Sequence, residues 1–517
     1  MKIAEETSDP TINLVLDTLN INKQALVFAN TKKSAEKTAE DIAKKIRTEN
    51  TKLKELSEQI LHALTRPTKQ CERLAMCVKR GIAFHHAGLV AKQRELIEDG
   101  FRYGLIKIIC STSTLAYGLD LPAFRAILKD LRRYSMRGLT YIPVLEYLQM
   151  AGRAGRPKFD SYGEAIAIAA TKPDKKKIDE MYINGEPEDI FSKLAVEPVL
   201  RTYLLSLIAT NFTNAKKDIF DFFSKTFWAY QFTDMEQIKA IIERMLLLLE
   251  EWEFIRPDKE KSDFQSADKI RDEKYKATIA GKRVAELYID PYTAHFMIEC
   301  LRKAANKQLK TFSFLQMISH TLEIKPLLRA RVKEQDKMQE ELLKYSDCLL
   351  EEEPSLYEPE YEDFINSIKT ALFFNDWVNE KDEEYLLEEY NIRPGEIRAK
   401  LDIADWLLYS TEELARILNF QELRKEIVKL RLRMKYGAKE ELLPLLQLHN
   451  IGRIRARRLY FNEIKDIADV KNADLMKLIQ ILGKNVALDV KKQVGQDFGK
   501  IEVKEGKRKG QISLKDY

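Results

Sequence analysis

The sequence lacks the features that mark a secreted, membrane-spanning or metal-bound protein. It has only five cysteines, Cys71, Cys77, Cys110, Cys300 and Cys348, and they show no paired spacing. Its six histidines form no HExxH or Cys/His pattern, so no structural metal is expected. No apolar run reaches about 18 residues, and the N-terminal MKIAEETSDP has no apolar signal core. These absences predict free thiols in a soluble, intracellular, cytoplasmic protein.

A phosphate-binding loop of the GxxxxGK[ST] type is also absent. None of the Gly-Lys pairs, at Gly281, Gly483, Gly499 and Gly506, is followed by Ser or Thr. Every Asp-Glu pair has Tyr two positions after its Glu, so none reads DExH or DExD. Such motifs hold the phosphates and the Mg²⁺ of a P-loop ATPase. The sequence therefore excludes a self-contained P-loop ATPase.

Composition indicates a large globular protein with a charged surface. The 517 residues suffice for several domains, with 45% hydrophobic and 32% charged residues and a net charge of only +5. The charge is unevenly distributed, because residues 345–363 are acidic and the stretch from Arg424 onward is rich in Lys and Arg. A basic end is compatible with a nucleic-acid partner and equally with a solvated surface.

The first 180 residues alternate between strand and helix signals. Short apolar runs at 25–29, 106–110 and 165–169 predict buried strands, and the amphipathic stretch 33–47 predicts a helix capped near Thr31 or Ser34. This alternation predicts a parallel sheet with crossover helices.

The rest of the chain reads mainly as helix. We expect an α/β domain over 1–184, a winged helix over 185–258, a linker or surface insertion over 259–284, a helical domain over 285–437, a small basic helical domain over 438–497 and a basic tail over 498–517. The winged-helix prediction rests on a helix cluster that ends in a short strand, and the linker prediction on the scarcity of large apolar residues.

The strongest motif is a turn with two glycines and two arginines, QMAGRAGRP, which runs from Gln149 to Pro157. The guanidinium groups of Arg153 and Arg156 are permanently charged and can pair bidentately with phosphate oxygens. An arginine directed at a transferring phosphoryl group stabilises its transition state. Taken alone, the motif is equally a glycine-rich turn with surface arginines.

Three further motifs precede it in a fixed order. They are LVFANT from Leu26, FHHAGL from Phe84 and STSTLAYGLDLPA from Ser111. The four together resemble motifs IV, IVa, V and VI of superfamily 2 helicases. The sequences of these motifs are similar to those of the large archaeal DNA-repair helicases. That family is related to the superkiller RNA helicases and to the helicase part of polymerase theta. The resemblance extends over nearly the whole chain and implies a RecA-like (P-loop-type) α/β domain followed by all-α winged-helix, helical ratchet and helix–hairpin–helix domains.

The resemblance also implies roles for individual residues. Arg153 and Arg156 would be arginine fingers, with Gln149 nearby, and Thr114, Gly118 and Asp120 would couple the nucleotide cleft to the DNA path. The family often has Asn where Asp120 stands. The motor loops would contact DNA through Asn30, Thr31, His86, Gly88 and Thr112. A β-hairpin predicted around Gly138 would separate strands with Arg133, Tyr134, Arg137 and Tyr141; without the resemblance it is an ordinary surface hairpin.

The C-terminal part carries three further candidate contacts. Trp406 would stack on a base, or else belongs to the core among Ile403, Leu407 and Leu408. The family usually has Arg seven residues before this Trp; here that residue is Ala399, beside Arg398, so the contact is shifted or weakened. The glycine hairpin NIGRIRARR suits DNA phosphates through Arg453, Arg455, Arg457 and Arg458. The final Gln511, Leu514 and Tyr517 resemble a sliding-clamp (PCNA) peptide.

The combined prediction is one half of an ATP-dependent DNA helicase associated with the nucleoid. The resemblance implies 3′ to 5′ translocation on single-stranded DNA and unwinding of forks in repair and replication restart. ATP and Mg²⁺ would be held mainly by a first RecA-like lobe on a separate N-terminal polypeptide, if the chain is a natural half of a split helicase; a truncated product is the other possibility, and the split is favoured. The alternatives are a non-catalytic DNA-binding module that retains a relic motor lobe, or half of an RNA helicase.

Overall fold

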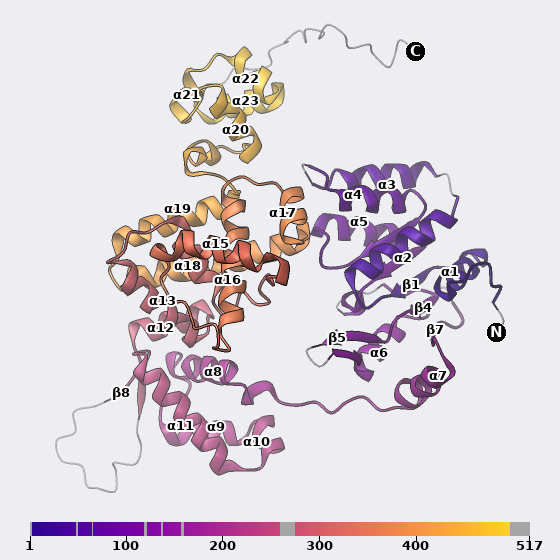
Figure 1. Cartoon of the computed structure of the whole chain (residues 1–517), viewed down its shortest axis with the longest axis horizontal. Coiled ribbons are helices and arrows are strands. Elements are labelled where there is room, and N and C mark those ends of the chain that lie inside the picture. The colour runs from indigo at the N-terminus through magenta and orange to yellow at the C-terminus, as the bar shows by residue number, and fades with distance from the viewer. Residues whose placement is uncertain are drawn as a thin grey trace. The chain divides into compact units, whose positions relative to one another are not determined.

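The computed structural model describes residues 3–47, 50–64, 66–117, 121–135, 138–156, 160–258 and 274–496 (Figure 1). The chain divides into two compact units. The first contains Met1–Phe296, Leu322–Ile324 and Asp382–Ile403; the second contains Met297–Thr321, Lys325–Lys381 and Ala404–Tyr517. Within the described part of the chain, no helix is both long enough and apolar enough to cross a membrane.

A five-stranded parallel sheet forms the centre of the N-terminal domain. Its strands are β1 (Ala25–Phe28), β2 (Ile82–His85), β3 (Ile108–Ser111), β4 (Arg125–Leu128) and β7 (Glu164–Ala167). They lie in the order β2-β3-β1-β4-β7. In the register, Ala25 of β1 lies opposite Ile108 of β3 on one side and opposite Arg125 of β4 on the other. The parallel sheet and the three strands expected from the apolar runs are confirmed.

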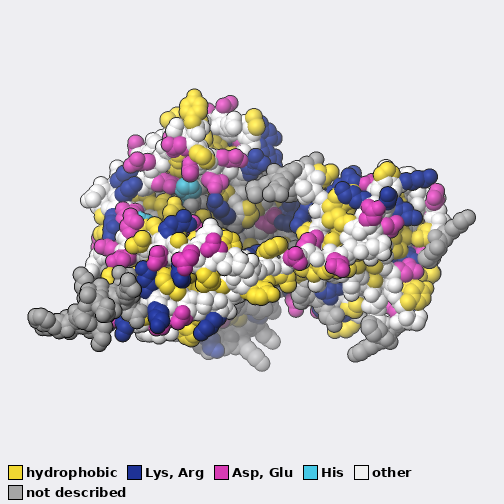
Figure 2. Space-filling view, turned by 90° about the horizontal axis from the view of Figure 1, so that it is seen from below, with side chains coloured by type: hydrophobic (Ala, Val, Ile, Leu, Met, Phe, Trp, Pro, Cys, Tyr) yellow, Lys and Arg dark blue, Asp and Glu magenta, His cyan; other side chains and the backbone are white. Residues whose placement is uncertain are grey.

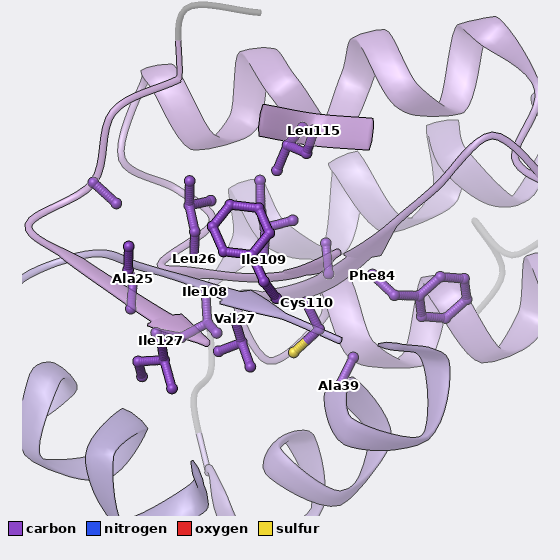
Figure 3. Close-up of a cluster of buried hydrophobic side chains, with 14 of the residues drawn as sticks. Ala25, Leu26, Val27, Ala39, Phe84, Ile108, Ile109, Cys110, Leu115 and Ile127 are labelled. Carbon is purple, nitrogen blue, oxygen red and sulfur yellow. The ribbon is translucent and has the colours of Figure 1, made fainter. Parts of the chain in front are cut away.

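Seven helices accompany this sheet. They are α1 (Pro10–Asn20), α2 (Lys32–Lys45), α3 (Thr51–Leu61), α4 (Lys69–Val78), α5 (Ala91–Arg102), α6 (Val144–Ala151) and α7 (Lys172–Ile178). Helices α2 and α4 contact β2, while α1 and α6 contact β4. The central strands are fully buried, because side chains such as Leu26, Val27 and Ile109 pack between these helices (Figure 3). Apolar runs without polar alternation are what a sheet covered on both faces requires.

The predicted β-hairpin is present between β4 and α6. Strands β5 (Arg132–Ser135) and β6 (Gly138–Tyr141) pair antiparallel, with Arg133 opposite Thr140. Gly138 has a φ of +91°, a left-handed conformation that costs glycine nothing.

A helical cluster and a two-stranded sheet follow. The elements are α8 (Glu197–Ala209), α9 (Lys216–Ser224), α10 (Phe227–Phe232), α11 (Met235–Glu251), β8 (Ile255–Pro257), β9 (Tyr275–Ala277) and α12 (Ile279–Leu287). Strand β9 and most of α12 lie in the described part of the expected linker 259–284, from residue 274 onward. Tyr275 and Ala277 are buried, and β9 pairs with β8. The winged-helix assignment and the other domain boundaries stay predictions.

The remaining helices complete the chain. Up to residue 437 they are α13 (Pro291–Ala304), α14 (Thr311–Ser319), α15 (Gln335–Tyr345), α16 (Tyr361–Val378), α17 (Glu383–Tyr390), α18 (Pro394–Ile417) and α19 (Gln421–Tyr436). After it come α20 (Arg453–Phe461), α21 (Ile467–Asn472), α22 (Leu475–Leu482) and α23 (Lys484–Gln493), which enclose their own apolar cluster from Ala438 to Val490.

Candidate nucleotide and DNA interface

Three of the four motifs supply residues at one edge of the parallel sheet. Asn30 and Thr31 follow β1, His86 and Gly88 follow β2, and Thr112 and Thr114 follow β3. Because β2, β3 and β1 are parallel neighbours, their carboxyl ends lie side by side. Loops at this edge of an open α/β sheet are its usual ligand-binding position.

The hydroxyl and amide groups at this edge are mostly accessible. Thr31 caps α2, since its Oγ1 accepts a hydrogen bond of 3.0 Å from Ser34 N, as expected from the sequence. The Asn30 side chain donates to the carbonyl oxygen of Arg132 at 2.7 Å and so joins the loop after β1 to the hairpin. The hydroxyls of Thr112 and Thr114 lie 2.9 Å apart.

His86 lies inside the protein in this structure, and its contact with DNA stays a prediction. Its side chain is fully buried, with Nε2 lying 3.1 Å from Glu36 Oε1 and Nδ1 accepting a hydrogen bond from Gly88 N. Burial lowers the pKa of His86, although Glu36 opposes this. His86 therefore shapes the loop that carries Gly88, in which Ala87 is exposed and Gly88 is buried.

Glu36 is the centre of a buried polar cluster that sequence reasoning missed. Its carboxylate also accepts hydrogen bonds from Gln70 at 2.9 Å, Arg73 at 3.0 Å and Arg393 at 3.0 Å. Burial alone would raise the pKa of Glu36, but the hydrogen bond from His86 and the charge of Arg393 dominate and lower it to about 2. Glu36 lies in the sequence SAEKTAE, from Ser34 to Glu40, but nothing in the sequence indicates that it contacts Arg393.

The first turn of α18 closes over the same loop. Gly395 N donates a hydrogen bond of 3.0 Å to the Gly88 carbonyl oxygen, and a methyl group at Gly395 would collide with the carbonyl oxygens of Ala87 and Leu89. Lys32 of α2 also forms an ion pair with Glu396. Together with the bond between Arg393 and Glu36, these contacts hold the start of α18 against the loop after β2.

The arginine turn lies near the opposite, amino-terminal ends of the strands. Ala123, just before β4, donates from its backbone N to the Arg153 carbonyl oxygen at 2.9 Å and accepts from Gly155 N at 2.7 Å. The Arg153 side chain donates from Nε to the carbonyl oxygen of Ala116, at 3.2 Å, in the 3₁₀ helix η1 (Ser113–Ala116). Gln149 is exposed on α6. Gly118 and Asp120 lie outside the described residues.

Arg156 already has protein partners in this structure. Its Nε donates to Asp160 Oδ2 at 2.6 Å and its Nη1 to Gln24 Oε1 at 2.7 Å, and its side chain is 18% exposed. The hydrogen bond from Arg156 lowers the pKa of Asp160, which also pairs with Lys23 at 2.7 Å. To bind a phosphate, Arg156 must break its hydrogen bonds to Asp160 and Gln24, whereas Arg153 must break its hydrogen bond to the Ala116 carbonyl oxygen.

The hairpin is anchored at its base. Arg132 stacks over the Tyr141 ring at 4.6 Å and pairs with Asp174, and Arg133 donates to Glu146 at 2.9 Å. At the free end of the hairpin, Leu139 is 52% exposed. Arg137 and the side chain of Tyr134 lie outside the described part of the structure.

The two candidate contacts on α18 differ in accessibility. Arg398 is exposed. Trp406 is half-buried, while its neighbours Leu407 and Leu408 are fully buried. The indole is thus at the boundary of the core and not inside it.

The four arginines of the glycine hairpin separate into two pairs. Arg455 and Arg458 are exposed. Arg457 donates to Glu380 at 2.8 Å and to Glu441 at 2.9 Å, and Arg453 lies 4.3 Å over the Trp377 ring. Gly452 precedes α20 directly, so the hairpin does present a helix N-terminus, as expected. Among these four, Arg455 and Arg458 are the exposed pair, and Nη1 of Arg455 also donates to the Asn450 carbonyl oxygen at 2.7 Å.

The clamp-like residues Gln511, Leu514 and Tyr517 lie outside the described residues. Among the residues that are described, no group of three or more His, Cys, Asp or Glu side chains could hold a metal ion. Figure 2 shows Lys/Arg and Asp/Glu side chains intermingled over the face in view.

Comparison with known proteins defines the class first. Residues 10–158 match the helicase conserved C-terminal domain, and residues 312–437 match domain 4 of archaeal helicases. The first match covers strands β1 to β4 of the parallel sheet and the arginine turn, and the second covers Trp406. The class is therefore that of archaeal helicases with a RecA-like C-terminal lobe.

Full-length relatives give the family. The chain is 36% identical over 523 residues to the ATP-dependent DNA helicase Hel308 of Methanococcus vannielii, covering 94% of this chain and 68% of the relative. It is 38% identical over 507 residues to the proteins of the same name from Pyrococcus horikoshii and Pyrococcus abyssi, covering 96% of this chain and 67% of each relative. The chain belongs to the Hel308 family of ATP-dependent DNA helicases. These relatives do not favour the alternatives of an RNA helicase or a non-catalytic module.

Proposed function

We propose that this chain supplies the second RecA-like lobe and the DNA grip of an ATP-driven helicase that translocates 3′ to 5′ on single-stranded DNA and unwinds forks. The first RecA-like lobe, with its GK[ST] loop and DExH strand, would come from a separate polypeptide. Family membership and the names of the relatives support the DNA helicase activity. The resemblance of the motifs supports the direction and the division of labour.

One observation carries the proposal. The segment from Thr112 to Ala123 begins at the sheet edge where the DNA-contact loops gather and ends beside the arginine turn. Its Ala116 carbonyl oxygen accepts from the Arg153 side chain, and Ala123 bonds to the backbone of the same turn. A displacement of the turn on nucleotide binding would therefore be transmitted to Thr112 through one short stretch of backbone.

The residues present fit only part of an ATP and Mg²⁺ site. Arg153 and Arg156 can offer guanidinium donors to phosphate oxygens once their present partners are exchanged. The described residues offer no carboxylate cluster for the metal. Mg²⁺ would consequently be held by the first lobe, where it would neutralise charge on the phosphates.

The test is ATP hydrolysis in the presence of single-stranded DNA. We expect no turnover by this chain alone and DNA-stimulated turnover after a first-lobe polypeptide of the same family is added. Turnover by this chain alone would refute the division of labour. DNA-stimulated turnover with unwinding only of forks that offer a 5′ single-stranded arm would refute the 3′ to 5′ direction.

Two further roles follow from the resemblance. The hairpin β5–β6 would part the strands at its free end, near Leu139; deletion of that end should abolish unwinding while leaving DNA-stimulated hydrolysis intact.

The tail with Gln511, Leu514 and Tyr517 would bind a sliding clamp (PCNA), and a Gln511→Ala chain should then fail to co-elute with the clamp.

A further inference from the structure

The exposed side of α18 carries a second aromatic residue next to Trp406. Tyr409 follows Trp406 by three residues and is likewise half-buried. Residues three apart are neighbours on a helix surface, and the buried Ala404, Leu407 and Thr411 lie on the opposite side of α18. Both rings are therefore on the side of the helix that reaches the surface.

A guanidinium group lies against the Tyr409 ring. Arg431 of α19 places its Cζ 4.7 Å from the ring centroid, which is within the range of a cation–π contact. The Arg431 side chain is 34% exposed. Tyr409 and Arg431 thus form a stacked pair, here called the Tyr409–Arg431 stack, at the surface beside Trp406.

The hydrogen-bonding edge of Arg431 is already occupied. Its Nε donates to Asp405 Oδ1 at 2.8 Å and its Nη2 to Asp405 Oδ2 at 3.3 Å, while Nη1 lies 3.6 Å from Glu412 Oε2. The hydrogen bond with Asp405 raises the pKa of Arg431. Asp405 takes two of the N–H donors and Glu412 adds a second negative charge beside Nη1, so this arginine is already paired with carboxylates and is not presented as a phosphate ligand. Its planar face is what remains for an outside partner.

We propose that the Tyr409–Arg431 stack is a second nucleobase platform, which holds a base of single-stranded DNA next to the base on Trp406. This inference rests on the proposed function and adds a binding residue from α19 to it. Bases stack on aromatic rings and on guanidinium planes irrespective of sequence, as a translocating motor requires. Three residues of helix rise about 4.5 Å, close to the roughly 3.4 Å between successive bases, so adjacent bases can occupy adjacent platforms.

The surrounding charge favours bases over phosphates at this position. Asp405 and Glu412 flank the stack, and a phosphate brought close would meet these two carboxylates, which already pair with Arg431 and, at Glu412, with Arg424. A neutral base has no such penalty. The contact is therefore expected to be insensitive to salt, in contrast to a contact between arginine and phosphate.

The test measures binding of the full chain to a labelled oligodeoxythymidylate. Fluorescence anisotropy at several salt concentrations reports the affinity. Tyr409→Ala should weaken binding about five- to hundredfold, the range expected when one base–aromatic stack is removed, and Tyr409→Phe should restore it. Arg431→Lys, which keeps the charge but removes the plane, should also weaken binding without changing the salt slope. Tyr357→Ala and Arg329→Ala, at exposed positions of the same unit, are the matched controls and should bind like the unaltered chain.

A second measurement applies even if Tyr409→Ala folds poorly. In a Trp406→Ala chain, an abasic strand should still bind more weakly than oligodeoxythymidylate, because the Tyr409–Arg431 stack still holds a base. Equal binding of the two strands, or an Arg431→Lys chain that binds like the unaltered one, would overturn the platform. Failure of the unaltered chain to bind single-stranded DNA at all would instead overturn the proposed function.

Discussion

The Arg153 side chain donates to the carbonyl oxygen of Ala116, with 3.2 Å between Nε and the oxygen. This bond joins the turn expected to meet ATP to the segment that begins with Thr112 at the DNA edge of the sheet. Arg156, three residues on, donates to the side chains of Asp160 and Gln24. The two arginines are thus fixed by different contacts, and their substitutions should have separable effects.

Arg156→Ala should abolish ATP turnover in the assembly with a first lobe. Loss of an arginine that stabilises a transferring phosphoryl group costs about a thousandfold or more in rate. The measurement is single-stranded-DNA-stimulated phosphate release at saturating ATP.

Asp160→Asn is the matched control for Arg156, since it removes the carboxylate of the ion pair and leaves the guanidinium in place. If Arg156 meets the nucleotide, Asp160→Asn should retain most turnover. An equal loss in both variants would show that the ion pair maintains the turn and that Arg156 has no direct role.

The exposed and the paired arginines of the glycine hairpin should behave differently. Arg455→Ala with Arg458→Ala should weaken DNA binding and lower the slope of log affinity against log salt by about one for each phosphate that is no longer bound, with little effect on stability. Binding measured between low and physiological salt gives that slope. An unchanged slope would exclude phosphate binding by these two residues.

Arg457→Ala should instead act on stability. It leaves Glu380 and Glu441 without their shared cation, which should cost about 1–3 kcal/mol of the free energy of unfolding. Urea denaturation measures this loss. A variant as stable as the unaltered chain, but with a lower salt slope for DNA binding, would contradict the structural role.

The sequence predicted β1 and β3 well because these strands are buried on both faces, and it predicted the partly exposed edge strand β7 from its apolar run. Continuous apolar runs such as Ala25–Phe28 need no partner information, whereas β2, which precedes the FHHAGL motif, was not predicted as a strand. The β8–β9 pairing was missed because β9 follows a polar stretch and only two of its residues, Tyr275 and Ala277, are buried.

The sequence identified candidate residues of the site but did not predict which other residues they contact. The burial of His86 and the separation of Arg455 and Arg458 from Arg457 depend on partners distant in sequence. Glu36 lies more than three hundred residues before Arg393, and Arg457 is matched by Glu380 on another element. Spacing within a motif cannot report a partner of that kind, because only the folded chain brings the two together.

Gly395→Ala should destabilise the protein although alanine is the better helix former. Helix propensity alone favours the change by about 1 kcal/mol. The added methyl group would collide with the carbonyl oxygens of Ala87 and Leu89, and backbone cannot move aside as a flexible side chain can. A net loss of about 1–3 kcal/mol is expected. Gly452→Ala is the control, because a methyl group there would have no neighbour within 4 Å. Equal melting temperatures for the two variants would show that the loop after β2 is not held by α18.

Glu36 should make the stability of the first unit depend on pH in the acid range. Its folded pKa of about 2 lies below the ordinary value of 4.5. A carboxylate with a lowered pKa stabilises the folded state above the ordinary value, and this contribution disappears as the pH falls from 4.5 towards 2. The shift corresponds to about 3 kcal/mol of the free energy of unfolding. Urea denaturation at a series of pH values gives the free energy of unfolding.

The comparison with Glu36→Gln isolates this contribution from other titrating groups. The variant cannot offer a charged acceptor to Arg73 and Arg393, so it should be less stable than the unaltered chain near neutral pH. Since the unaltered chain loses the benefit on acidification and the variant does not, the difference between them should shrink as the pH is lowered below about 4.5. Glu55→Gln, at an exposed position of α3, should show no such gap. A difference that stays constant over the same range would mean that Glu36 contributes its shape and hydrogen bonds but not its charge.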